Sequence, residues 1–173
     1  FAAFMLFFAY IGIMTFTGDF MKSVLRLPSD RVGFLLSLTG FSGIIVSPLS
    51  GILGDRYGRR PVLAAGMSAV FAAMGLMFLI PFDYSLYMAL FLLMGAGSAA
   101  SWTTLNTLAV QSSVELRNPV TSLYNVIKFS GYAAAPFVFS YVYGGGRLRI
   151  VQALCAAVIL VALASSLRAA RRG

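Results

Sequence analysis

The apolar residues of this 173-residue chain fall into six long runs that are separated by short polar links. A helix needs about 20 mostly apolar residues to cross the hydrocarbon core of a bilayer. Each run is close to that length, and Pro, Asp, Arg and Gly residues mark the links. The pattern predicts one all-α membrane domain over residues 1–173, with transmembrane helices over about 2–24, 31–53, 61–80, 86–108, 119–142 and 149–167.

The composition supports lipid as the solvent of this fold. Hydrophobic residues make up 60% of the chain and charged residues only 10%, whereas soluble domains carry about 25% charged residues. The net charge of +8 does not indicate nucleic acid, because the basic residues do not share one polar face. We expect a multi-pass protein of the bacterial inner membrane with both ends in the cytoplasm, since basic residues cluster at Arg56, Arg59, Arg60, Arg168, Arg171 and Arg172.

The sequence offers little for covalent or metal chemistry. It has no histidine, and its one cysteine, Cys155, lies in an apolar run. No acidic pair or metal-ligand cluster recurs at helical spacing. We therefore expect no cofactor, no metal and no enzyme activity, and an intramembrane enzyme is the least favoured interpretation.

Two segments of the chain match at an offset of 88 residues. Phe41-Ser42-Gly43 followed by Pro48 corresponds to Phe129-Ser130-Gly131 followed by Pro136. The match predicts a 3+3 inverted repeat, in which the first three helices correspond to the last three. Chance similarity between membrane helices is the alternative. Small residues allow close helix packing and proline loosens the helix backbone, so we expect helix bends at Gly43, Pro48, Gly131 and Pro136.

The polar link after the second run carries a recognisable motif. It reads Gly51-Ile-Leu-Gly54-Asp55-Arg56-Tyr57-Gly58-Arg59-Arg60-Pro61, which resembles the signature loop G-x-x-x-D-R-x-G-R-R of the major facilitator superfamily. The resemblance implies a cytoplasmic loop that latches one half of a transporter to the other. A simple positive-inside anchor would explain the arginines but not the acid or the spaced glycines. The resemblance assigns this gating role to Gly51, Gly54, Asp55, Arg56, Gly58, Arg59 and Arg60.

Members of that family are built from two six-helix halves, and the resemblance implies that this chain is one of them. The run over 86–108 begins without an arginine, and Asn125 with Lys128 resembles the C-terminal half more closely. We expect the partner to be a second six-helix half, either on the same longer chain or in a second copy.

Lys128 is the strongest candidate for a polar cavity. A charge at the centre of a membrane helix costs at least about 2.5 kcal/mol, so it usually faces protein or water. Tyr124 and Tyr132 lie one helical turn on either side of Lys128, with Asn125 beside them. This face would suit an anionic group or a proton transfer. Snorkelling of the lysine to the membrane surface is the alternative.

Further candidates come from the runs over 2–24 and 86–108, which correspond to the central helices of the family. Asp19, one turn after Thr15, would accept a proton if it were buried, but a wet position at the outer membrane boundary is favoured. The resemblance implies substrate contacts for Tyr10, Thr15, Trp102, Thr103 and Asn106.

The predicted function is that of a secondary transporter, an antiporter or a symporter, which moves a small organic solute by alternating access. Coupling to protons and the direction of transport, uptake or efflux, stay open. The alternative is a membrane receptor or assembly protein that keeps the same fold without transport.

Overall fold

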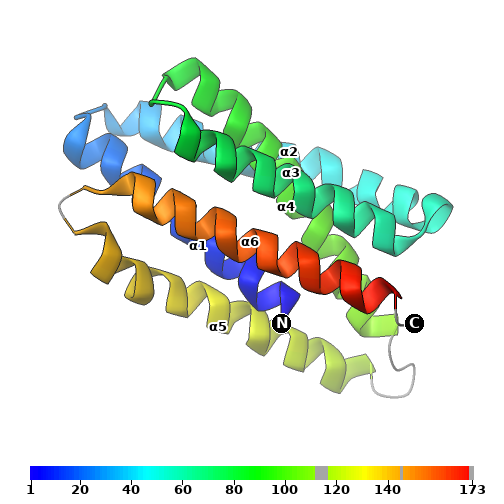
Figure 1. Ribbon diagram of the computed structural model, residues 1–173. Coiled ribbons are helices and arrows are strands. Elements are labelled where there is room, and N and C mark those ends of the chain that lie inside the picture. Colours follow the sequence, from blue (N-terminus) through cyan, green and yellow to red (C-terminus); the bar gives the residue numbers. More distant parts are fainter. Residues whose placement is uncertain (112–116, 145, 172–173) are drawn as a thin grey trace.

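The computed structural model describes residues 1–111, 117–144 and 146–171, without the side chains of 117 and 169–171. The described part is helical, and the helices run roughly side by side (Figure 1). The side chains of Arg117 and Arg171 and the whole of Arg172, which bear on membrane orientation, lie outside this description. The elements are α1 (Ala2–Asp19), the π-helical turn η1 (Phe20–Val24), α2 (Ser29–Tyr57), α3 (Arg59–Leu79), α4 (Tyr84–Gln111), α5 (Arg117–Tyr143) and α6 (Leu148–Arg171).

Five segments of the described chain are long and apolar enough to cross a membrane: Ala2–Val24, Ser29–Tyr57, Arg59–Leu79, Tyr84–Gln111 and Leu148–Arg168. The sixth predicted span corresponds to α5, which has 27 residues. It is therefore long enough but less apolar. Polar side chains that include Asn125 and Lys128 interrupt its hydrophobic pattern.

The sequence predicts a polar link between the second and third spans, and the length of that link is wrong. Residues 54–60 read as a polar connection, but α2 continues to Tyr57 and α3 begins at Arg59. Only Gly58 separates the two helices, with a φ of 94° that non-glycine residues rarely adopt. Charged side chains at exposed helix ends remain in water, so they do not need to end the helix. The motif therefore occupies a tight corner between two helices.

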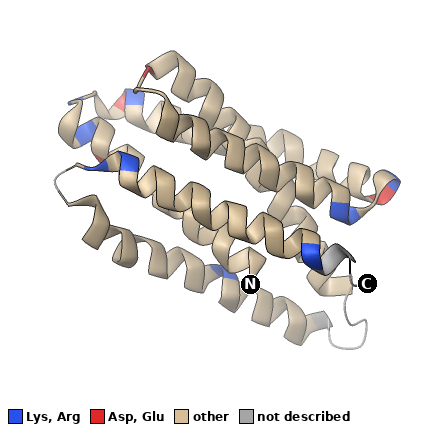
Figure 2. Cartoon of the chain, in the orientation of Figure 1, with Lys and Arg blue, Asp and Glu red and all other residues tan. Residues whose placement is uncertain are grey.

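The charged residues gather at the two ends of the bundle (Figure 2). The α2–α3 corner and the C-terminal end of α6 lie at one end of the bundle, and the α1–α2, α3–α4 and α5–α6 connections lie at the other end (Figure 1). Between the two ends, the charged residues of the described chain reduce to one basic position part-way along α5 (Figure 2), which the sequence identifies as Lys128.

Helices α1 and α4 organise the packing. α4 packs against α2 and α3, α1 packs against α5 and α6, and α3 also packs against α6. A Cβ atom at Gly95 of α4 would lie 2.5 Å from the Thr39 carbonyl oxygen of α2. A Cβ atom at Gly131 of α5 would lie 2.7 Å from the Phe4 carbonyl oxygen of α1. Glycine is needed at both crossings because the helix backbones approach so closely.

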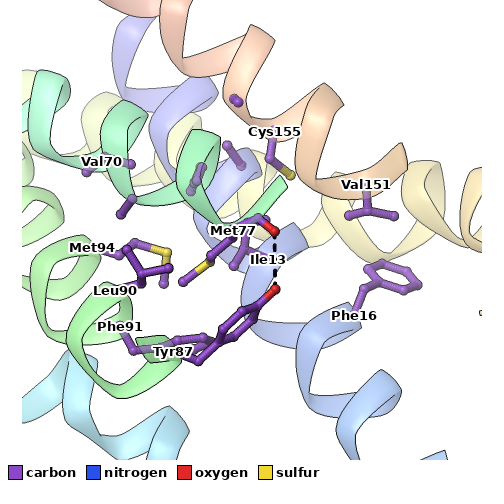
Figure 3. Close-up of a cluster of buried hydrophobic side chains, with 14 of the residues drawn as sticks. Ile13, Phe16, Val70, Met77, Tyr87, Leu90, Phe91, Met94, Val151 and Cys155 are labelled. Carbon is purple, nitrogen blue, oxygen red and sulfur yellow. Dashed lines mark hydrogen bonds between the residues drawn. The ribbon is translucent and has the colours of Figure 1, made fainter. Parts of the chain in front are cut away.

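The largest buried cluster takes side chains from all six α-helices, and Figure 3 shows members from α1, α3, α4 and α6. Two polar side chains of this region, Tyr87 and Gln152, are buried. The Gln152 amide donates a hydrogen bond to the Tyr87 phenol oxygen at 3.0 Å. The phenol in turn donates to the Met77 carbonyl oxygen at 3.2 Å, as the dashed line in Figure 3 shows. These bonds satisfy polar groups that would otherwise be costly to bury.

Candidate functional site: a cavity between α1, α4 and α5

A polar cavity of about 360 Å³ lies where α4 and α5 meet α1. It brings together seven of the residues that the sequence singled out: Trp102, Thr103, Asn106, Tyr124, Asn125, Lys128 and Tyr132. Thr107, Thr121 and Phe7 complete the lining. The cavity therefore combines hydroxyl, amide, ammonium and aromatic groups within an otherwise apolar bundle.

Helix α5 supplies half of these groups from one face. Residues 121, 124, 125, 128 and 132 are three or four positions apart, which places them along one side of a helix. Gly131 lets this helix approach the backbone of α1. The polar face is thereby held against Phe7, and the same residues make α5 less apolar than the other helices.

Lys128 points its ammonium group toward aromatic rings. The Nζ atom lies 4.7 Å from the centre of the Phe129 ring and 5.5 Å from the centre of the Phe7 ring. Ring faces attract cations, by about 0.5–2 kcal/mol depending on solvation. No carboxylate of the described residues forms an ion pair with Lys128, since the ion pair that they contain joins Arg59 to Asp55. Lys128 therefore gives this cavity a positive charge that the described carboxylates do not neutralise.

Aromatic contacts fix one wall of the cavity. The Trp102 ring lies parallel to the Phe7 ring, with 5.7 Å between the centres and 3° between the planes. Tyr132 packs against the same Phe7 ring at 5.2 Å. The Tyr124 hydroxyl donates a hydrogen bond to the Trp102 carbonyl oxygen at 3.3 Å. These contacts join α1, α4 and α5 into a rigid wall.

Three of the predicted residues lie elsewhere. Tyr10 contacts Trp102 edge-on but does not line the cavity, and its hydroxyl donates a hydrogen bond to Thr39 Oγ1 of α2 at 3.1 Å. Thr15 and Asp19 are exposed. Asp19 accepts a hydrogen bond from Ser23 at 3.1 Å and is not brought to Lys128.

Three lining residues were not predicted. Thr107 follows Thr103 by four residues on α4, and Thr121 precedes Asn125 by four residues on α5. Helical spacing from predicted neighbours would have found both. Phe7 is an apolar residue within an apolar run, so nothing in the sequence distinguishes it as a lining residue.

A larger hollow, of about 450 Å³, lies at the end of the bundle with the α3–α4 and α5–α6 connections. Its lining is mostly apolar, and its two arginines, Arg147 and Arg149, are exposed to solvent. It contains none of the predicted site residues. We therefore place the candidate site in the smaller cavity, where the predicted polar residues are collected.

The motif residues meet at the α2–α3 corner. Arg59 donates to the Asp55 carboxylate across Gly58. A Cβ atom at Gly54 would lie 3.0 Å from Cδ of Arg59, so the arginine stem passes directly over this glycine. The Arg59 side chain is 18% exposed and that of Asp55 is 72% exposed. The acidic group therefore stays open to a further partner.

Comparisons with known proteins agree with this architecture. A family model described as Major Facilitator Superfamily matches residues 1–172. The comparison with curated proteins gives no match. With its motif corner, its apolar helices and a family match over nearly its whole length, the chain belongs to the Major Facilitator Superfamily of small-solute transporters and is a multi-pass integral membrane protein.

Proposed function

We propose that this chain is one six-helix half of a secondary transporter that moves a small organic solute by alternating access. The observation that carries this proposal is the polar cavity between α1, α4 and α5. Polar and charged groups are costly inside a membrane bundle, so a cluster of them marks a solute or ion pathway. Solute binding would use the cavity residues, with Lys128 as the charged group.

The arrangement of the helices supports six crossings and an inverted repeat. Successive connections alternate between the two ends of the bundle, and α5 runs alongside α1 (Figure 1). The first three helices and the last three also pack on each other in a reciprocal way: α2 and α3 pack on α4, whereas α5 and α6 pack on α1. The glycines Gly95 and Gly131 provide the close approach in the two corresponding pairs.

A second half would complete the transporter. Helices α2 and α5 expose large apolar side chains, which include Phe41 and Ile44 on α2 and Phe129 and Phe137 on α5. Lipid or a second half would cover them, and we propose that the second half covers part of both faces. Because Asn125 and Lys128 resemble the pattern of the C-terminal half of this family, we propose that this chain is the C-terminal half. The open Asp55 carboxylate at the α2–α3 corner supports a releasable latch to the second half.

The test is solute flux in proteoliposomes that contain the full-length protein. A panel of neutral, anionic and cationic organic solutes is offered with and without a pH gradient, which also decides proton coupling. We expect at least one solute to move faster than in empty liposomes. Asn106→Ala should reduce this flux severalfold, since Asn106 lines the cavity.

Asn118→Ala is the matched control, because Asn118 is exposed in the first turn of α5. Its flux should equal that of the unchanged protein. Absence of flux under every gradient would overturn the proposal and leave the receptor or assembly role. Equal loss in both asparagine variants would show that the cavity is not the solute site.

A further inference from the structure

The position of Lys128 carries information about the solute. The other charged residues of the described chain lie near the ends of the bundle: Asp19, Lys22, Arg26, Asp30, Arg31, Asp55, Arg56, Arg59, Arg60, Asp83, Arg147, Arg149 and Arg168. Lys128 lies eleven residues after the start of α5 at Arg117, which corresponds to about 16 Å at the rise of an α-helix. It is the one charge that the described structure holds deep in the bundle.

The described residues of this half supply no anion for that charge. The described neighbours of Lys128 in the cavity are uncharged: two phenols, two amides, three threonines and two further aromatic rings. Lys128 is partly buried, and ring contacts and dipoles compensate a partly buried ammonium group only in part. The cavity therefore attracts one negative charge, and it repels a cation of similar size.

The remaining lining indicates what the anion is attached to. The buried Phe7 ring holds the partly exposed Trp102 ring parallel to it, and an aromatic face favours stacking of a planar apolar group. Asn125 and Tyr132 border Lys128 with groups that can donate hydrogen bonds to a carboxylate. A charge-assisted hydrogen bond to an oxyanion is about twice as strong as a neutral one. The polar and apolar parts thus fit the two ends of one small molecule.

From this arrangement we infer that the solute is an aromatic monoanion, whose carboxylate or similar oxyanion binds Lys128 while its ring packs against Trp102. The inference rests on the proposed function, because it names the substrate class of the same cavity. A monoanion fits better than a dianion, since Lys128 is the one charged residue among the described residues that line the cavity.

The test uses three probes that share one ring and differ in charge: benzoate, benzamide and benzylamine. Their binding to the purified full-length protein is measured by displacement of radiolabelled benzoate, with 2-naphthoate as a larger carboxylate. We expect the carboxylates to bind at least about tenfold more tightly than benzamide, the ratio that corresponds to about 1.4 kcal/mol. Benzylamine should bind most weakly.

The lysine variants test the cause of that preference. Lys128→Gln should remove the difference between benzoate and benzamide, and Lys128→Arg should keep most of it. Lys22 is the only other lysine of the 173 residues and is exposed in η1, so Lys22→Gln should bind like the unchanged protein. Thermal unfolding of each variant shows whether the fold is intact.

Three results would overturn the inference: tighter binding of benzamide or benzylamine, a carboxylate preference that survives in Lys128→Gln, or no binding of either carboxylate. These results are distinguishable from failure of the transporter proposal. Flux of a neutral or cationic solute that depends on Asn106 would keep the transporter and remove the anion. Carboxylate binding without flux under any gradient would keep the anion and remove the transporter.

Discussion

Gln152 of α6 donates a hydrogen bond to the phenol oxygen of Tyr87 on α4, 3.0 Å away, in the buried core of the bundle. The phenol hydroxyl itself donates a hydrogen bond to the Met77 carbonyl oxygen of α3. One hydroxyl therefore ties together three helices. None of these residues lines the proposed solute cavity, so this bond is a feature of stability rather than of solute binding.

Tyr87→Phe should destabilise the protein without changing the cavity. Loss of the hydroxyl leaves the Gln152 amide and the Met77 carbonyl without their partner, which costs about 1–3 kcal/mol in a buried site. Thermal unfolding in detergent should show a lower Tm. Tyr84→Phe is the control, because its hydroxyl bonds to the Arg31 carbonyl oxygen in an exposed position. An equal Tm for the two variants would contradict the argument.

Gly131→Ala should loosen the contact between α5 and α1. The added Cβ would lie 2.7 Å from the Phe4 carbonyl oxygen and 3.2 Å from the Phe8 nitrogen, so the two backbones must separate. Overpacking of this kind costs about 1–3 kcal/mol. The Tm should fall, and solute binding should weaken because α5 carries much of the cavity.

A glycine in open space provides the comparison for that variant. A Cβ atom at Gly75 of α3 meets nothing within 4 Å. Gly75→Ala should leave the Tm unchanged or raise it, since alanine favours the helix more than glycine does. A fall in Tm at Gly75 as large as that at Gly131 would refute the close-approach explanation.

Asp55→Asn should reduce transport while leaving the fold intact. The ion pair with Arg59 is largely exposed on the Asp55 side, and such pairs contribute about 1 kcal/mol or less to stability. A latch to a second half would nevertheless lose its charge, so flux should fall at an unchanged Tm. Asp83→Asn, at the opposite end of the bundle, should affect flux little, because its side-chain oxygen only caps the Leu86 N–H. Normal flux in Asp55→Asn would favour a simple membrane anchor.

Much of the fold could be predicted from the sequence, because membrane helices are set by the length of apolar runs. The corner at Gly58 could not be predicted, since charged residues read as a link whether they lie in a loop or at a helix end. The four-residue spacing of Tyr124, Lys128 and Tyr132 predicted that they share one helix face, and the structure places all three at the cavity.

The site residues of α1 were harder to assign. Polarity singled out Tyr10, but its hydroxyl turns to Thr39 of α2, whereas the apolar Phe7 reaches the cavity. Which face of α1 meets α5 depends on the close approach at Gly131. A local pattern of polarity carries no information about that contact. The outcome was therefore decided by tertiary packing.

The central claim is that the cavity opens to each side of the membrane in turn, and thiol labelling tests it most directly. Cys155 is the only cysteine of the chain and is fully buried, so the unchanged chain should resist a membrane-impermeant thiol reagent. Asn125→Cys places a thiol in the cavity, and Asn118→Cys places one on an exposed helix end. In oriented vesicles, the thiol at position 118 should react from one side only. The thiol at position 125 should react from either side, with an opposing solute gradient shifting the preferred side. Labelling of position 125 from a single side under every gradient would contradict alternating access.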